Sequence, residues 1–273
     1  MPIILHQVDH LQKAYILKRP SATIKSPFVA DIILDGDKSK TVYLAHTPSL
    51  GCNGLCDLMS TVYVAPIQSP KCQYRVYLAQ FRDRGHTIRI GVEPKMAEKI
   101  AHQSLERGLF SDFKIKTLKS EQQILRSRFD FVGMTQQDQS FICEVKNVSL
   151  ADYADVTKKE RQKLDFSHLL YDQKLAYFPD GYRKQASDPV SCRSIKQLED
   201  LMEIRRTQPE TRCVILYIIQ RQDVNRFQPS RLDPIYVDKL QQAVKCGVEL
   251  KALQVKWSRN KAYLVTAKLP INF

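Results

Sequence analysis

The sequence predicts an α/β protein (α+β, with a mixed sheet) in two parts: a small β-barrel over residues 1–90 and a mixed-sheet domain over residues 91–273. Three observations support this prediction. Short apolar stretches separated by turn residues fill the first part, where no helical period appears. Helix-like and strand-like stretches alternate afterwards, which is typical of α/β domains. The stretch 213–219 is apolar on both faces and fits the central strand of a covered sheet.

In the first part, the strands are short and the turns contain glycine or polar residues. The stretch 28–34 leads through an Asp-Gly-Asp turn into 41–45, which is the pattern of a β-hairpin. Further strands fit 60–65 and 73–81. Together they predict a five-stranded barrel. We expect the linker to the second part at residues 89–94.

In the second part, the apolar spacing changes along the chain in a fixed order. The expected elements are a helix over 93–109, two strands over 126–131 and 141–147, a polar tract over 151–191, a helix over 194–207, a strand over 213–219, a helix over 234–246 and two strands over 248–256 and 261–269. Gly247 is suited to end the last helix. Strands and helices in this order predict a mixed sheet.

The two strands that follow the first helix carry the residues of chemical interest. Asp130 lies on one, and Glu144 and Lys146 lie two residues apart on the other, so the latter two share a face. Apolar neighbours such as Phe129 and Val145 predict that these strands are buried, where charges need a metal or a partner. Two carboxylates beside a lysine can hold Mg²⁺ and steer a water, which is nuclease chemistry. The alternative is a structural ion-pair cluster.

Composition favours a polyanionic partner. The chain has 42 Lys and Arg against 29 Asp and Glu, a formal net charge of +13. Such an excess attracts nucleic acid by counterion release; acidic small substrates and anionic membranes are the remaining classes. No glycine-rich phosphate loop is present, which argues against an ATPase or a dinucleotide enzyme.

The apolar runs and the cysteines indicate where in the cell the protein is expected. The longest apolar run, 214–219, is too short to cross a bilayer, and the N-terminus has no secretory signal pattern. We therefore expect a soluble intracellular protein, in the cytoplasm or nucleoid, without a membrane partner. The seven cysteines form an odd, scattered set, which predicts reduced thiols.

Separated motifs across the chain resemble those of a known family. They are Phe28-Val-Ala-Asp-Ile, Arg128-Phe-Asp-Phe, Glu144-Val-Lys-Asn-Val, Phe178-Pro-Asp, Gln220-Arg-Gln-Asp, and Asp233-Pro-Ile-Tyr leading to Gly247-Val-Glu. In order and spacing they resemble the sugar fermentation stimulation protein A (SfsA) family, and the chain looks like a divergent member. The resemblance implies an OB-fold-like barrel followed by a PD-(D/E)xK restriction-endonuclease-like domain.

The resemblance also implies function. It implies DNA binding and a nuclease (phosphodiesterase) site that uses Mg²⁺ or Mn²⁺, with a homo-oligomer compatible with the sequence. The alternative is a non-catalytic DNA-binding regulator of sugar fermentation (maltose metabolism) genes. The intact Asp130, Glu144 and Lys146 favour the nuclease, because two carboxylates facing a phosphate would repel it without a metal.

Carried over residue by residue, the resemblance assigns metal binding to Asp130 and Glu144 and catalysis to Asp130, Glu144, Lys146 and Gln220. Further candidates beside this site are Glu121, Asp180, Arg221 and Asp223. For Gln220 and Arg221 the alternative role is to hold the end of the central strand. For Asp180 the alternative is a simple turn.

Cations along the chain are the candidate nucleic-acid contacts. The predicted set is Arg128, Lys158, Lys159, Arg183, Lys184 and Arg221, with Arg161, Lys163 and Arg193 close by and Tyr153, Tyr171, Tyr177 and Tyr182 interleaved. Cations bind phosphates and rings stack on unpaired bases, which suits single strands or frayed ends. The alternative is a solvated loop.

The chain departs from the family pattern at three places. The stretch 45–50 keeps only Thr47 and Ser49 of the usual barrel motif. Gln103 stands where a glutamate is usual on the first helix, which removes one carboxylate from the metal environment. Gln197 stands in the place of a histidine. These departures predict a substrate choice different from that of bacterial members.

Overall fold

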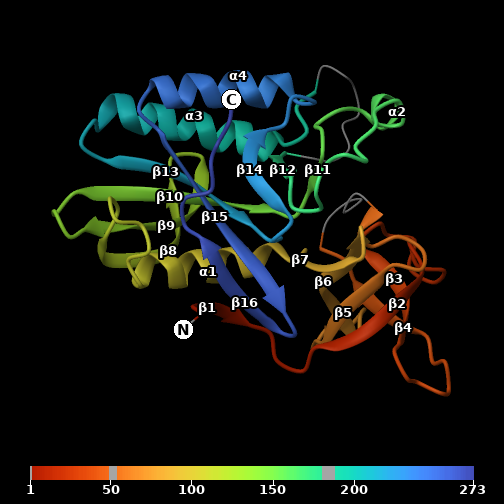
Figure 1. Cartoon of the computed structure of the whole chain (residues 1–273). Helices are drawn as coiled ribbons and strands as arrows, with labels where there is room; N and C mark the ends of the chain where they lie inside the picture. Colours follow the sequence, from red (N-terminus) through yellow and green to blue (C-terminus); the bar gives the residue numbers. More distant parts are fainter. Residues whose placement is uncertain (1, 49–53, 180–187) are drawn as a thin grey trace.

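Alternating buried aliphatic residues close the first part of the chain into a barrel, seen in red and orange in the computed structural model of Figure 1. The structure describes residues 2–48, 54–179 and 188–273. The barrel strands are β2 (Gln12–Lys18), β3 (Val29–Leu34), β4 (Tyr43–His46), β5 (Thr61–Pro66), β6 (Tyr74–Asp83) and β7 (His86–Gly91). Pairing of β4 with β6 closes β2 to β6 into a five-stranded ring, and β7 extends β6. The predicted five-stranded barrel is confirmed.

The second part is built on a seven-stranded mixed sheet in the order β1-β16-β15-β13-β10-β9-β8. Its strands are β1 (Ile4–Gln7), β8 (Ile115–Ile124), β9 (Ser127–Thr135), β10 (Ser140–Val148), β13 (Arg212–Ile219), β15 (Glu249–Ser258) and β16 (Lys261–Thr266). The three central strands β10, β13 and β15 are parallel, and the outer pairs are antiparallel. As predicted, β13 is buried on both faces. The predicted α/β domain with a mixed sheet is confirmed.

Helices cover both faces of this sheet (Figure 1). α1 (Pro94–Glu106) packs on one face, and α3 (Cys192–Thr207) and α4 (Pro234–Lys245) pack on the other. Glu93 caps α1 and Asp233 caps α4 with side-chain oxygens, and Gly247 takes the positive φ of 89° predicted after α4. Within the described parts of the chain, no helix has the length and apolar character needed to span a membrane.

The polar tract after β10 has more structure than its composition predicts. It contains β11 (Ala151–Asp152), the short helix α2 (Lys158–Arg161) and β12 (Lys174–Phe178). With β14 (Val224–Pro229), β11 and β12 form a separate three-stranded sheet. These strands are short and find their partners far along the chain, so local periodicity does not mark them. β7 and β8 were also absent from the predicted elements.

The N-terminal strand joins the second part rather than the barrel. β1 pairs with β16, so residues 4–7 lie at the edge of the seven-stranded sheet. β7 runs almost directly into α1, where we expected a linker. Cys72, Cys143, Cys192, Cys213 and Cys246 carry free thiols, as the scattered set predicted, and Cys52 lies outside the described residues.

The barrel contacts the second part through the tip of its β6–β7 hairpin. Lys174 of β12 contacts Asp83 at 2.5 Å, and the ring of His86 stacks on Tyr171 with centroids 3.7 Å apart. The Arg84 side chain donates to the backbone carbonyl of Ser167. The tract that sequence composition marked as polar is therefore held against the barrel.

Candidate active site

The predicted site forms where β9 and β10 separate. The two strands pair as far as Cys143 and Phe131. Beyond that point, the N–H of Val145 donates to the carboxylate of Asp130 at 2.8 Å. The Asp130 side chain thus enters the space that opens between the strands and meets the residues of β10 there.

Glu144 and Lys146 share one face of β10, as their spacing predicted. The Lys146 Nζ atom donates to Glu144 Oε1 at 2.9 Å and to Gln197 Oε1 on α3 at 2.6 Å. Glu144 is 3% exposed and Lys146 is 7% exposed. The amide of Gln197, in the place of the usual histidine, therefore fixes the position of the lysine ammonium group.

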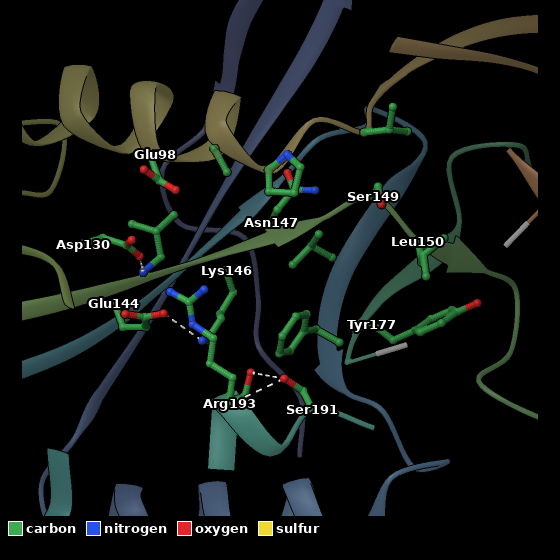
Figure 2. A pocket seen from close by; sticks show the side chains of 17 residues that line it. Glu98, Asp130, Glu144, Lys146, Asn147, Ser149, Leu150, Tyr177, Ser191 and Arg193 are labelled. Atoms are coloured by element: carbon green, nitrogen blue, oxygen red, sulfur yellow. Dashed lines mark hydrogen bonds and ion pairs between the residues drawn. The ribbon is translucent and has the colours of Figure 1, made fainter. Parts of the chain in front are cut away.

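Asp130, Glu144 and Lys146 line a cavity of about 380 Å³, shown in Figure 2. Its opposite walls carry Glu98 from α1, Tyr177 from β12 and Arg193 from the start of α3. Tyr177 and Arg193 belong to the set predicted to contact nucleic acid, and Arg193 is exposed. The cavity, hereafter the main cavity, thus combines carboxylates with a lysine, an arginine and a ring.

Among the described residues, the carboxylates of Asp130 and Glu144 have too few hydrogen-bond donors and cations around them. Burial and the nearby Glu144 carboxylate raise the pKa of Asp130 to about 7, although the N–H of Val145 opposes this. Glu144 Oε2 is buried and has no hydrogen-bond partner in the described part of the chain. Such a buried, unsatisfied anion is costly unless a cation binds it. The pair therefore fits a hard divalent cation.

The carboxylates do not amount to a complete metal cage. Among the described residues, no three Asp, Glu, His or Cys side chains are grouped to hold an ion. Mg²⁺ is commonly bound through one or two carboxylates and keeps waters or substrate phosphate oxygens as its other ligands. Asp130 and Glu144 match that pattern.

Of the residues that the structure describes, Glu98 is the one acidic residue at the main cavity that sequence reasoning missed. It lies beside Asp130 in Figure 2, and its charge also contributes to the raised pKa of Asp130. The family comparison directed attention to Gln103, one turn further along α1. A helical projection could have found Glu98, because it precedes the buried Ala101 by three residues and so borders the face of α1 that covers the sheet.

Comparison with known proteins identifies the family. The family described as "Sugar fermentation stimulation protein RE domain" matches residues 95–158 and 167–261. The chain belongs to this family. A sugar fermentation stimulation protein homolog from Desulforamulus reducens is 29% identical over 225 residues, which cover 81% of this chain and 79% of that protein. A homolog from Carboxydothermus hydrogenoformans is 28% identical over 244 residues, covering 86% and 88%.

A solved member of the SfsA family shares the fold. The structure of Pyrococcus furiosus SfsA in complex with Ca²⁺ superposes with a TM-score of 0.73. It covers 99% of this chain and 100% of that chain at 18% identity. The architecture of barrel and α/β domain is thus common to both proteins.

Gln220 and Arg221 are not brought into the main cavity. The Gln220 amide donates to Asn147 and accepts from the indole N–H of Trp257, both at 2.9 Å, and its backbone carbonyl accepts from Gly91 of the barrel. Arg221 is 3% exposed and makes two hydrogen bonds of 2.7 Å to Asp223. These contacts favour the second of their two predicted roles, to hold the end of the central strand.

The other predicted residues lie around the site or beyond the described chain. Glu121 is exposed and pairs with Lys95 at 2.9 Å, and Arg128 lies 3.8 Å from it. Lys158 and Lys159 are exposed on α2 and do not line the main cavity. Asp180, Tyr182, Arg183 and Lys184 lie outside the described residues.

Proposed function

We propose that this SfsA-family protein is a metal-dependent nuclease that hydrolyses phosphodiester bonds, with DNA as the first candidate substrate. One observation carries the proposal: Asp130, Glu144 and Lys146 converge in one cavity where the acids lack enough partners. The net charge of +13 supports an anionic polymer as the substrate.

Asp130 and Glu144 would hold the cation, Mg²⁺ or Mn²⁺. The Ca²⁺ bound by Pyrococcus furiosus SfsA is a hard cation of the same kind, which supports this choice. The bound cation would polarise the scissile phosphate and lower the pKa of a water. Glu98, beside Asp130, would add negative charge to the same environment.

The chain's own groups would position the reactants. Lys146, held by Gln197, would offset charge on the phosphate or orient the attacking water. The water oxygen forms a bond to phosphorus and gives up a proton, while one ester oxygen leaves with its electron pair and takes up a proton from solvent. Arg193 and Tyr177 at the wall would contact the neighbouring phosphate and base.

Cleavage of labelled single-stranded, double-stranded, flapped and RNA-containing substrates with Mg²⁺ or Mn²⁺ tests the proposal. We expect Glu144→Gln and Lys146→Met to lower the rate by at least about 10²–10³-fold, since each removes charge needed at the reacting phosphate. Glu199→Gln, at a half-buried residue of α3 that does not line the main cavity, and Lys256→Met, at an exposed strand lysine, are matched controls.

Two results would contradict the assigned site or the nuclease activity. Equal cleavage by Glu144→Gln and by the unchanged protein would refute the assigned site. Metal-independent binding, with none of these substrates cut, would instead support the non-catalytic DNA-binding regulator.

A further inference from the structure

A second cavity lies on the other side of Asp130. It has a volume of about 580 Å³ and is formed between α1, β8, β9 and β1. Asp130 and Glu98 line both this cavity and the main cavity. Whatever is bound at Asp130 can therefore extend into either cavity.

The walls of the second cavity are apolar and aromatic at one end. Leu5 and Phe131 are buried beneath it, and the rings of His6 and His102 border it. The His102 ring lies 5.8 Å from that of Phe131. Such surfaces suit a flat ring that stacks or packs edge-on.

Polar groups at the rim match the edges of a neutral heterocycle. The Gln103 amide and Ser120 hydroxyl can each donate and accept hydrogen bonds. Burial and the charge of Lys99 lower the pKa of His6 to about 4, so its imidazole is neutral at pH 7 and offers both a donor and an acceptor.

The charges at the rim disfavour a phosphate in this cavity. Three carboxylates, those of Glu98, Glu121 and Asp130, line it against one lysine, Lys99, so the lining repels a phosphate more than it attracts one. Lys95, the nearest partner of two of them, is already paired with Glu98 at 2.7 Å and Glu121 at 2.9 Å. A neutral base does not carry this penalty.

We propose that the second cavity binds a nucleobase of the nucleotide next to the scissile phosphate. The proposal rests on the proposed nuclease function and narrows its substrate. A base can enter only when it is unpaired and turned out of the stack, so the substrate is a single strand or a locally unpaired segment. The base then selects which phosphate lies at Asp130.

An abasic scan tests the base subsite separately from cleavage. Short labelled single-stranded oligonucleotides, each with one abasic position, are titrated with the Glu144→Gln protein and followed by fluorescence anisotropy. We expect one position at which the missing base weakens binding about tenfold, equivalent to about 1.4 kcal/mol. A uniform effect along the strand would overturn the proposal.

A second substitution identifies the cavity as the cause. In a protein carrying both Glu144→Gln and His102→Ala, the intact oligonucleotide should bind about tenfold more weakly and the abasic effect at that position should disappear. His168→Ala, an exposed histidine on another segment, should preserve the abasic effect. Persistence of that effect in the His102 variant would overturn the assignment.

The two proposals fail in different ways. Saturation-transfer NMR of the unchanged protein with free nucleosides, and with ribose as the control, measures base binding without any cleavage. A protein that cleaves nucleic acid but shows a uniform abasic scan and no nucleoside signal refutes the base subsite alone. A protein that binds nucleosides through His102 but cuts no substrate refutes the nuclease alone.

Discussion

Two buried acid–base clusters of this protein differ in charge balance. The site cluster comprises Asp130, Glu144 and Lys146; the interface cluster comprises Asp83, Lys174, Arg221 and Asp223. The site cluster lies between β9, β10 and α1, and the interface cluster joins the barrel to the second part. In each cluster, carboxylates contact cations away from solvent.

In the interface cluster, the acids are satisfied. Both oxygens of Asp223 accept from Arg221, and Lys174 lies 3.0 Å away. Burial alone would raise the pKa of Asp223, but the hydrogen bonds and charges of Arg221 and Lys174 outweigh it and hold the pKa below its usual value. Lys174 also contacts Asp83.

In the site cluster, the single lysine leaves negative charge in excess. The pKa of Asp130 is raised to about 7, and Glu144 Oε2 has no hydrogen-bond partner in the part of the chain that the structure describes. Burial and residue types are similar in the two clusters, so neither property tells them apart. The carboxylate charge left without a partner distinguishes the site cluster from the interface cluster.

Asp130→Asn should produce the largest difference between the clusters. Cleavage should fall at least about 10³-fold, because one of the two carboxylates that would hold the cation is lost. The metal-free fold should lose no stability at pH 8, because the substitution removes repulsion with Glu144. Cleavage rates and urea unfolding measure the two effects. A large loss of stability with cleavage retained would show that Asp130 is structural.

Asp223→Asn should lower the stability of the fold, in contrast to Asp130→Asn. It leaves Arg221 and Lys174 as buried cations with too few acceptors, so the free energy of unfolding should fall by about 3–5 kcal/mol. Urea denaturation at pH 7 measures it. A loss under about 1 kcal/mol would mean that the interface cluster is no better balanced than the site cluster.

Cation binding should depend on pH only through the site cluster. The pKa of Asp130 rises from its usual 3.8 to about 7, so the affinity for Mn²⁺ should fall up to about tenfold per pH unit below 7 as the proton competes. Calorimetric titration across about pH 5.5–8 measures this. The exposed variant Asp138→Asn should keep the dependence; an affinity that stays constant over the range would contradict the charge excess.

The stability of the metal-free protein should fall as the pH rises, whereas the affinity for the cation should increase. Because the folded protein holds the Asp130 proton more tightly than the unfolded chain, this proton stabilises the fold fully below about pH 4. That contribution is lost as the pH rises toward 7. Urea unfolding in the presence of a chelator should show this slope in the unchanged protein and a smaller one in Asp130→Asn.

The sequence predicted the parts that depend on local pattern. The barrel, the central strand and the shared face of Glu144 and Lys146 follow from residue spacing. The pairing of β1 with β16 and the three-stranded sheet did not, because their partners are distant in the chain. Gln220 and Arg221 carried a motif whose contacts proved internal, and Glu98 had no motif, since only the tertiary fold brings it to Asp130.

The smallest expected effect comes from an exposed ion pair, compared with a buried lysine of the interface cluster. The pairs Lys116–Asp138 and Lys174–Asp83 have the same N–O distance of 2.5 Å. The side chains are 57% and 69% exposed in the first pair but 4% and 18% exposed in the second. Lys116→Met should therefore change the free energy of unfolding by less than about 0.5 kcal/mol, and Lys174→Met should lower it by several kcal/mol. Equal effects in urea denaturation would show that neither burial nor the second partner of Lys174, Asp223 at 3.0 Å, adds to the strength of its contacts.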